Sequence, residues 1–121
     1  MKLVHNVVVS DEELRTSWLE ILELPIQAAD GNVFQFDLDS ERLMKRALSG
    51  WDAAGITVIN WRLNDNAEVA CDKIKLEEYY DELVIKSSLR GFSVDLEYQA
   101  FKIDMPSPTE LEAWVDSHRI Q

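Results

Sequence analysis

Three acidic residues near the start of a predicted helix could hold a metal ion. Asp37, Asp39 and Glu41 place carboxylates at alternate positions, as a calcium-binding loop begins. The glycine and the closing bidentate glutamate of such a loop are missing, and a helix start favours acidic residues in any case. One cysteine and two distant histidines do not supply a zinc ligand set. We therefore expect no metal and no other cofactor.

A cysteine and a histidine are the next combination that could carry out catalysis, with Cys71 as nucleophile and His5 or His118 as base. Cys71 follows Ala70 in a predicted strand, where a free cysteine behaves as a small buried apolar residue. Activation would require a nearby cation or a helix N-terminus, which the helix after Asp72 offers only loosely. The chain has no glycine-rich phosphate loop and no GxSxG motif. We expect a protein that is not an enzyme.

Apolar periodicity and capping residues predict four helices, over about residues 11–24, 39–54, 74–101 and 108–118. Ser10 with Glu13, and Ser107 with Glu110, match capping boxes. Gly55 is placed to end the second helix in a left-handed conformation, and Gly91 favours a break in the third. The apolar positions of the third helix include Leu76, Tyr79, Tyr80, Leu83, Leu89, Phe92 and Leu96.

Strands are predicted in three places. A β-branched cluster over residues 3–9 indicates a first strand, and residues 33–37 indicate a second with an aromatic face. Residues 56–71 form a β-hairpin, with Asn64, Asp65 and Asn66 in its turn. The order β-α-β-α-β-β-α-α predicts an α+β fold, with a small antiparallel sheet packed against helices. We expect one domain over residues 1–104 and a Pro-bounded C-terminal helix over 105–121, packed on the domain or on a partner.

The composition excludes several classes of partner. The chain has 121 residues, of which 46% are hydrophobic and 29% charged, as in folded globular domains. Its formal net charge of −11 disfavours both a nucleic-acid backbone and an anionic membrane surface. The first residues contain no apolar run of signal-peptide length, and no stretch is long enough to span a membrane. A single cysteine suits a reducing compartment.

Aromatic residues are the candidate contacts for a protein partner. Tryptophan is common both in cores and at interaction hot spots. Trp18 and Trp51 lie on apolar helical stripes and are predicted to be core residues. Trp114 and its neighbour Val115 are candidate partner contacts, because they lie on a short terminal helix after a Pro-rich boundary. Tyr79 and Tyr80 cannot both face the core, so one of them is predicted to be exposed within an acidic segment.

From Gly31 to Lys102 the order of features resembles a known domain. Residues 34–37 (FQFD) lead into a helix, Gly55 precedes residues 59–61 (INW) of a predicted strand, and an acidic cap starts a long helix. This pattern is similar to an uncharacterised domain that recurs in tail-fibre and tail-fibre-assembly proteins of tailed bacteriophages and prophages. The resemblance is most specific at residues 61–66 (WRLNDN). The long helix departs from the pattern because it carries Gly91 and contains less alanine.

The resemblance implies a structural component of the phage tail or a helper in its assembly, with no catalytic residues. The partner would be another tail protein or a second copy, in the host cytoplasm during assembly or in the virion tail. The residues expected to hold the domain together are Trp51, Trp61, Asp65, Asn66 and Gly55. Two other functions stay open: an acidic inhibitor that mimics nucleic acid, and a small hydrolase with a perturbed carboxylate or an exposed Cys71.

Overall fold

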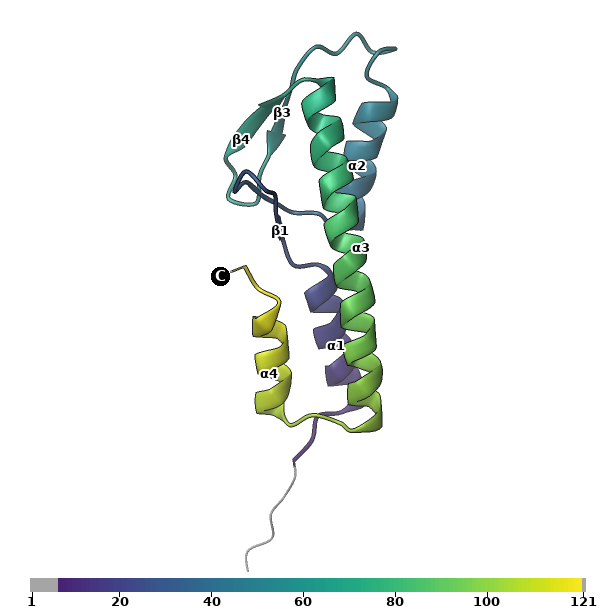
Figure 1. The fold of residues 1–121 in the computed structure, drawn as a ribbon, viewed down its shortest axis with the longest axis vertical. Coiled ribbons are helices and arrows are strands. Elements are labelled where there is room, and N and C mark those ends of the chain that lie inside the picture. Colours follow the sequence, from purple (N-terminus) through teal and green to yellow (C-terminus); the bar gives the residue numbers. More distant parts are fainter. Residues whose placement is uncertain (1–6, 121) are drawn as a thin grey trace, which may run out of the picture.

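A single long helix, α3 (Lys73–Ile103), organises the molecule, and the other elements pack along it (Figure 1). The computed structural model describes residues 7–120. At 31 residues, α3 extends about 46 Å. The remaining elements in chain order are α1 (Asp11–Leu22), β1 (Ile26–Gln27), β2 (Val33–Phe34), α2 (Leu38–Ser49), β3 (Ile59–Arg62), β4 (Glu68–Cys71) and α4 (Pro108–Ser117). The α+β fold class is therefore confirmed, with two small antiparallel sheets.

Both predicted capping boxes are present. The Ser10 hydroxyl accepts a hydrogen bond from the Glu13 backbone N–H at 3.1 Å, and the Glu13 carboxylate accepts one from the Ser10 N–H at the same distance. Ser107 and Glu110 make the same reciprocal pair at the start of α4. Each box satisfies two donors that a helix start would otherwise leave unpaired. Asp72 caps α3 by accepting from the Lys75 N–H at 2.8 Å.

Helix α2 is shorter than predicted, ending at Ser49 rather than near residue 54. Residues 50–55 form turns instead, in which the Ile56 N–H donates to the Trp51 backbone oxygen at 3.0 Å. These turns bring the Trp51 side chain into the core, a tertiary contact that outweighs the local helical pattern. Gly55 has φ +68, so the predicted left-handed conformation is present, but it closes the turns rather than the helix.

The two sheets are hairpins. β3 pairs with β4 in the predicted segment, with Trp61 opposite Val69, and Asn66 adopts φ 69 in the turn. β1 pairs with β2, so that Ile26 lies opposite Phe34. The sequence did not predict β1, whose two residues are too few to show a periodicity. The order of elements is therefore α-β-β-α-β-β-α-α.

The predicted first strand is not formed in the part of the chain that the structure describes. Val7–Val9 have no strand assignment, and Leu3 and Val4 lie outside the described residues. Val9 is buried, and its N–H donates to the Pro106 backbone oxygen at 2.9 Å. This bond ties the start of the described chain to the loop between α3 and α4.

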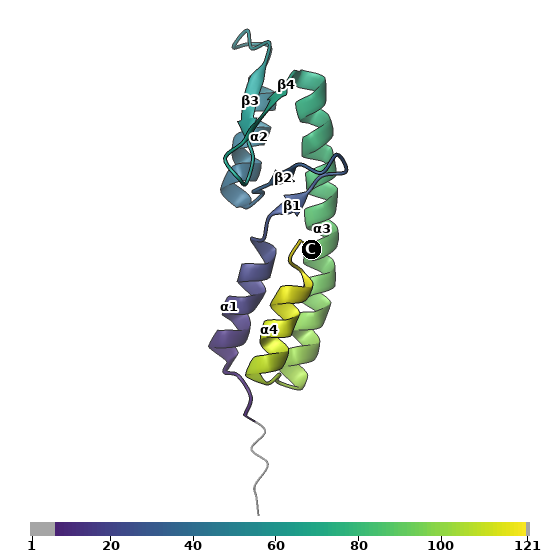
Figure 2. The same ribbon diagram turned by 90° about the vertical axis from the view of Figure 1, so that its left-hand side faces the viewer.

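Helix α3 is shared by two separate cores. Its N-terminal half packs against α2 and the hairpins, and its C-terminal half packs against α1 and α4 (Figure 2). The helix runs without a break through Gly91, contrary to the expected break. A glycine inside a helix costs only about 1 kcal/mol, less than the contacts that hold α3 on both sides of it. No helix within residues 7–120 has the length and apolar character needed to cross a bilayer.

Candidate functional site

The candidate nucleophile has no catalytic environment. Cys71 is fully buried at the end of β4, and this burial raises the pKa of its thiol. His118 lies elsewhere, with its Nε2 atom 2.9 Å from the Glu97 carboxylate, and His5 lies outside the described residues. A buried thiol with a raised pKa is a poor nucleophile, because the thiolate is the reactive form. Within the described residues, Cys71 and His118 are therefore not brought together as a cysteine mechanism would require.

The acidic residues of the predicted calcium-like segment have a structural role. The Asp37 carboxylate accepts from the Ser40 backbone N–H at 2.8 Å and from the Gln35 side chain at 2.8 Å. The bond from the Ser40 N–H is the main reason that the pKa of Asp37 is lowered. Among residues 7–120, no group of three or more potential ligands is placed to hold a metal ion. Asp37 therefore acts as the N-cap of α2.

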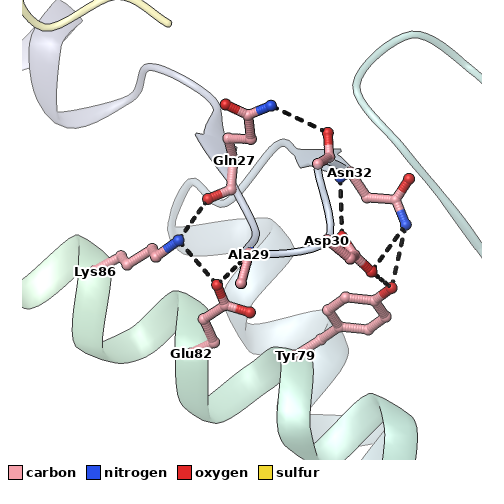
Figure 3. Close-up of polar contacts among 8 residues, drawn as sticks. Gln27, Ala29, Asp30, Asn32, Tyr79, Glu82 and Lys86 are labelled. Carbon is pink, nitrogen blue, oxygen red and sulfur yellow. Dashed lines mark hydrogen bonds and ion pairs between the residues drawn. The ribbon is translucent and has the colours of Figure 1, made fainter.

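A polar cluster fastens the β1–β2 turn to α3 (Figure 3). The Tyr79 hydroxyl donates to the Asp30 carboxylate, and the Asn32 side chain donates to the Tyr79 oxygen at 3.1 Å. One turn further along α3, the Glu82 carboxylate accepts from the Ala29 backbone N–H at 2.6 Å. Asp30 and Asn32 of the β1–β2 turn thus meet Tyr79 and Glu82 of α3 within about one helical turn.

The pKa shifts in this cluster favour an Asp30 carboxylate that stays charged and holds the turn, rather than a proton-transfer site. The hydrogen bond from Tyr79, followed by that from the Asn32 backbone, lowers the pKa of Asp30. Burial and then the bond to Asp30 raise the pKa of Tyr79. The two pKa values move apart, so Asp30 stays ionised and Tyr79 stays neutral near pH 7. We interpret the cluster as the attachment of the turn to α3.

The residues predicted as partner contacts lie mostly inside the chain's own cores. Trp114 and Val115 are buried between α4, α1 and α3, and Tyr79 is buried beneath the β1–β2 turn. Tyr80 is half-buried and makes an edge contact with Phe36. The Pro-bounded helix α4 covers α1 and α3 instead of projecting outward, so these side chains offer little surface to a partner.

The residues predicted to be structural lie in the β3–β4 hairpin and in the turns that precede it. Trp51 is buried in the first core, and Trp61 is half-buried against the same core. The Asp65 carboxylate accepts from the Ala67 N–H at 3.0 Å, which stabilises the turn in which Asn66 has a positive φ. Trp61, Asp65 and Asn66 thus belong to the β3–β4 hairpin, whereas Trp51 and Gly55 lie in the turns before β3.

The longest row of exposed apolar side chains on α3 is a stripe that was not among the predicted partner contacts. Its members are large aliphatic or aromatic side chains that remain 59–89% exposed: Ile85, Leu89, Phe92, Leu96 and Ile103. We call these five residues the α3 stripe. Beside the C-terminal half of α3, α1 and α4 lie on one side (Figure 2). Near the start of the stripe the β1–β2 segment contacts α3, because Lys86 Nζ donates to the Gln27 backbone oxygen at 2.8 Å.

The spacing of the α3 stripe is that of a helix-docking face. Ile85, Leu89, Phe92 and Leu96 follow one another at intervals of four, three and four residues, and Ile103 follows one heptad after Leu96. Residues at these intervals lie on one side of a helix. The stripe extends over about 27 Å of helix. Contiguous apolar patches on a soluble protein typically mark interaction sites.

The acidic segment of α3 lies just before this stripe. Glu77, Glu78 and Asp81 are exposed, whereas Glu82 is bound to Ala29 and Lys86. The free carboxylates occupy little more than one turn of α3, a short row compared with the phosphate backbone that an inhibitor would imitate. On α3, the apolar surface is therefore longer than the acidic one.

Comparison of the chain with protein-family models, with curated proteins and with solved structures finds no match. The resemblance to tail-associated proteins therefore stays a prediction from the sequence.

Proposed function

We propose that this protein is a non-enzymatic interaction domain that binds its partner through helix contacts along the α3 stripe. The single observation that supports it is the row of large apolar side chains left exposed on a helix whose other side packs against α1 and α4. Helix-to-groove and helix-to-helix binding use anchors at this spacing. Following the sequence resemblance, we further propose that the protein acts in a bacteriophage or prophage tail, as a component or an assembly helper.

The energetics of the stripe are adequate for a reversible complex. Covering one partly exposed Leu, Ile or Phe side chain contributes about 1–2 kcal/mol. Association costs about 4–15 kcal/mol in lost translational and rotational freedom. Five stripe residues together contribute about 5–10 kcal/mol, which offsets only part of the range of this cost, so the partner must contribute an apolar surface of its own. We therefore expect a partner with a matching apolar helix or groove.

The test is capture of partners by the tagged chain from cells that produce the phage. The informative variant is L89S/F92S, which removes the centre of the stripe. A matched control is L43S on α2, since Leu43 is 60% exposed and Leu89 is 64% exposed. Because all three side chains are exposed, the thermal unfolding midpoint should change little in either variant.

We expect the wild type and L43S to capture a tail-fibre or baseplate protein and L89S/F92S to lose it. Equal capture of that protein by both variants would exclude the stripe as the surface that binds it. Capture of a nuclease or repressor instead, abolished by salt and unaffected by L89S/F92S, would favour the acidic inhibitor.

A further inference from the structure

We infer that the α3 stripe pairs with the α3 stripe of a second copy, in antiparallel orientation. This inference rests on the proposed function, because it names the partner of the same surface. Its first support is the symmetry of the stripe. The intervals from Ile85 through Leu89 and Phe92 to Leu96 are four, three and four, and they read the same in both directions.

The four stripe residues from Ile85 to Leu96 have palindromic spacing, so this part of the stripe can match itself about a two-fold axis. When that axis passes midway between Leu89 and Phe92, Leu89 lies beside the partner's Phe92 and Ile85 lies beside the partner's Leu96. A two-fold interface uses the same surface on both copies, so each of these contacts occurs twice. Such layers of side chains at intervals of three and four are the packing units of helix pairs.

The charges beside the stripe favour the antiparallel orientation. In this register Asp81 faces the partner's Lys102, at both ends of the pair, and both side chains are exposed. Glu82, whose carboxylate already accepts from the Ala29 N–H and pairs with Lys86, lies beside the partner's neutral Gln99. The antiparallel orientation thus places Asp81 of each copy near Lys102 of the other, at both ends of the helix pair.

A parallel pair in register would bring like charges together. The stripe positions before Ile85 are occupied by Glu78 and Glu82. In a parallel pair each of these carboxylates would face its own copy along the apolar seam, which is unfavourable. In the antiparallel pair, Ile103 lies beside the partner's Glu78 instead, at the solvent-exposed end of the overlap.

Small side chains beside the stripe allow the two helices to approach closely. Ser88, Ser93 and Ala100 flank it and are all exposed. Short flanking residues let helix axes approach to about 8–10 Å, the usual distance for packed helices. Ten stripe side chains, each exposing on the order of 100 Å², would bury at most about 1,000 Å² in total, at the lower limit for specific interfaces. We therefore expect a dimer with a micromolar dissociation constant.

The test is sedimentation equilibrium of the purified full chain from about 1 to about 200 µM, a range that spans a micromolar dissociation constant. The average mass should rise from 13.9 kDa toward twice that value as concentration increases. We expect L89S/F92S to weaken dimerisation at least 100-fold and the matched control L43S to leave it unchanged. A dimer that is unaffected by L89S/F92S would overturn the inference.

Charge reversal tests the orientation separately. D81K and K102D should each weaken the dimer by about 3–10-fold, and the double variant D81K/K102D should restore it, because both end pairs are reversed together. A dimer insensitive to K102D would overturn the antiparallel register.

The outcomes also separate this inference from the proposed function. A chain that is monomeric at every concentration, but whose L89S/F92S variant loses a tail protein in the capture experiment, would overturn self-pairing and retain the stripe as an interface. A monomer whose capture is also unaffected by L89S/F92S would overturn both.

Discussion

The guanidinium of Arg90 on α3 lies 2.9 Å, at Nη2, from the backbone oxygen of Leu22, the last residue of α1. Its Nη1 atom donates to the backbone oxygen of Leu24 at 2.9 Å. The described last turn of α1 carries no basic residue of its own. Arg90 thus supplies the positive charge that the C-terminal end of a helix favours, and it fixes the direction in which the chain leaves α1 toward β1.

Replacing Arg90 should therefore destabilise the protein more than its position on a helix surface suggests. We expect R90A to lower the free energy of unfolding by about 2–3 kcal/mol, because two charge-assisted hydrogen bonds to carbonyls are lost. R90K should recover less than half of this loss, since a lysine cannot reach both oxygens with a rigid fork. Urea denaturation measures both values, with K45A on α2 as an exposed control. An R90A loss no larger than that of K45A would contradict this role.

The polar cluster predicts how stability falls in acid. In the unfolded chain Asp30 titrates near 3.8, and in the folded chain its pKa is lower. Between these values the unfolded state binds more protons, so stability decreases as the pH falls through this window. The contribution of Asp30 is complete above about pH 5 and is lost as the pH approaches the folded pKa. Asp37 and Glu110 have lowered pKa values as well and add to the same slope.

We expect D30N to be less stable than the wild type at pH 7 and to approach it as the pH falls below 3.8 toward the folded pKa of Asp30, giving a shallower dependence of the urea midpoint on pH. The matched variant Y79F removes the donor that contributes most to the lowered pKa of Asp30. It should flatten the acid slope in the same direction and cost about 1 kcal/mol at pH 7. Slopes identical to that of the wild type in both variants would show that the cluster does not hold the charge of Asp30.

Two glycines should respond to alanine in opposite directions. Gly91 lies inside α3, and an added Cβ would meet no atom within 4 Å outside its own stretch of helix. G91A should therefore raise the free energy of unfolding by about 0.5–1 kcal/mol. Gly55 has φ +68, a conformation that costs an alanine about 1 kcal/mol or more, so G55A should destabilise. Thermal melts of the two variants measure the contrast, and a shift in the same direction for both would contradict it.

The parts of the fold that follow local rules were predictable from the sequence. Ser10, Asp72 and Ser107 start helices because each side chain accepts a hydrogen bond from the backbone N–H three residues ahead, a local contact. The end of α2 was not predictable, because burial of Trp51 in the first core overrides a helical pattern that continues past Ser49. β1 was missed for a related reason, since its pairing with β2 depends on where the chain leaves α1.

The α3 stripe could have been found from spacing alone. The apolar positions of the long helix do not form one face. Leu83 and Leu89 are six residues apart, which places them about 120° apart around the helix. One subset, ending at Leu83, faces the first core, and the other, from Leu89 to Leu96, faces away. Two apolar faces on one helix indicate that packing within the chain covers only one of them.

Trp114 provides the clearest test between a core residue and a contact residue. Its ring lies edge-on to Phe101, with centroids 5.1 Å apart, inside the second core. W114A should lower the free energy of unfolding by about 3–5 kcal/mol, because it leaves a cavity between α4, α1 and α3. W114F should cost clearly less, since the Trp114 Nε1 atom has no hydrogen-bond partner among the described residues. Urea denaturation followed by circular dichroism measures both, because removing a tryptophan would alter the fluorescence signal itself. If W114A unfolds at the wild-type midpoint and yet no longer captures a partner, Trp114 contributes to binding and α4 is not packed as described.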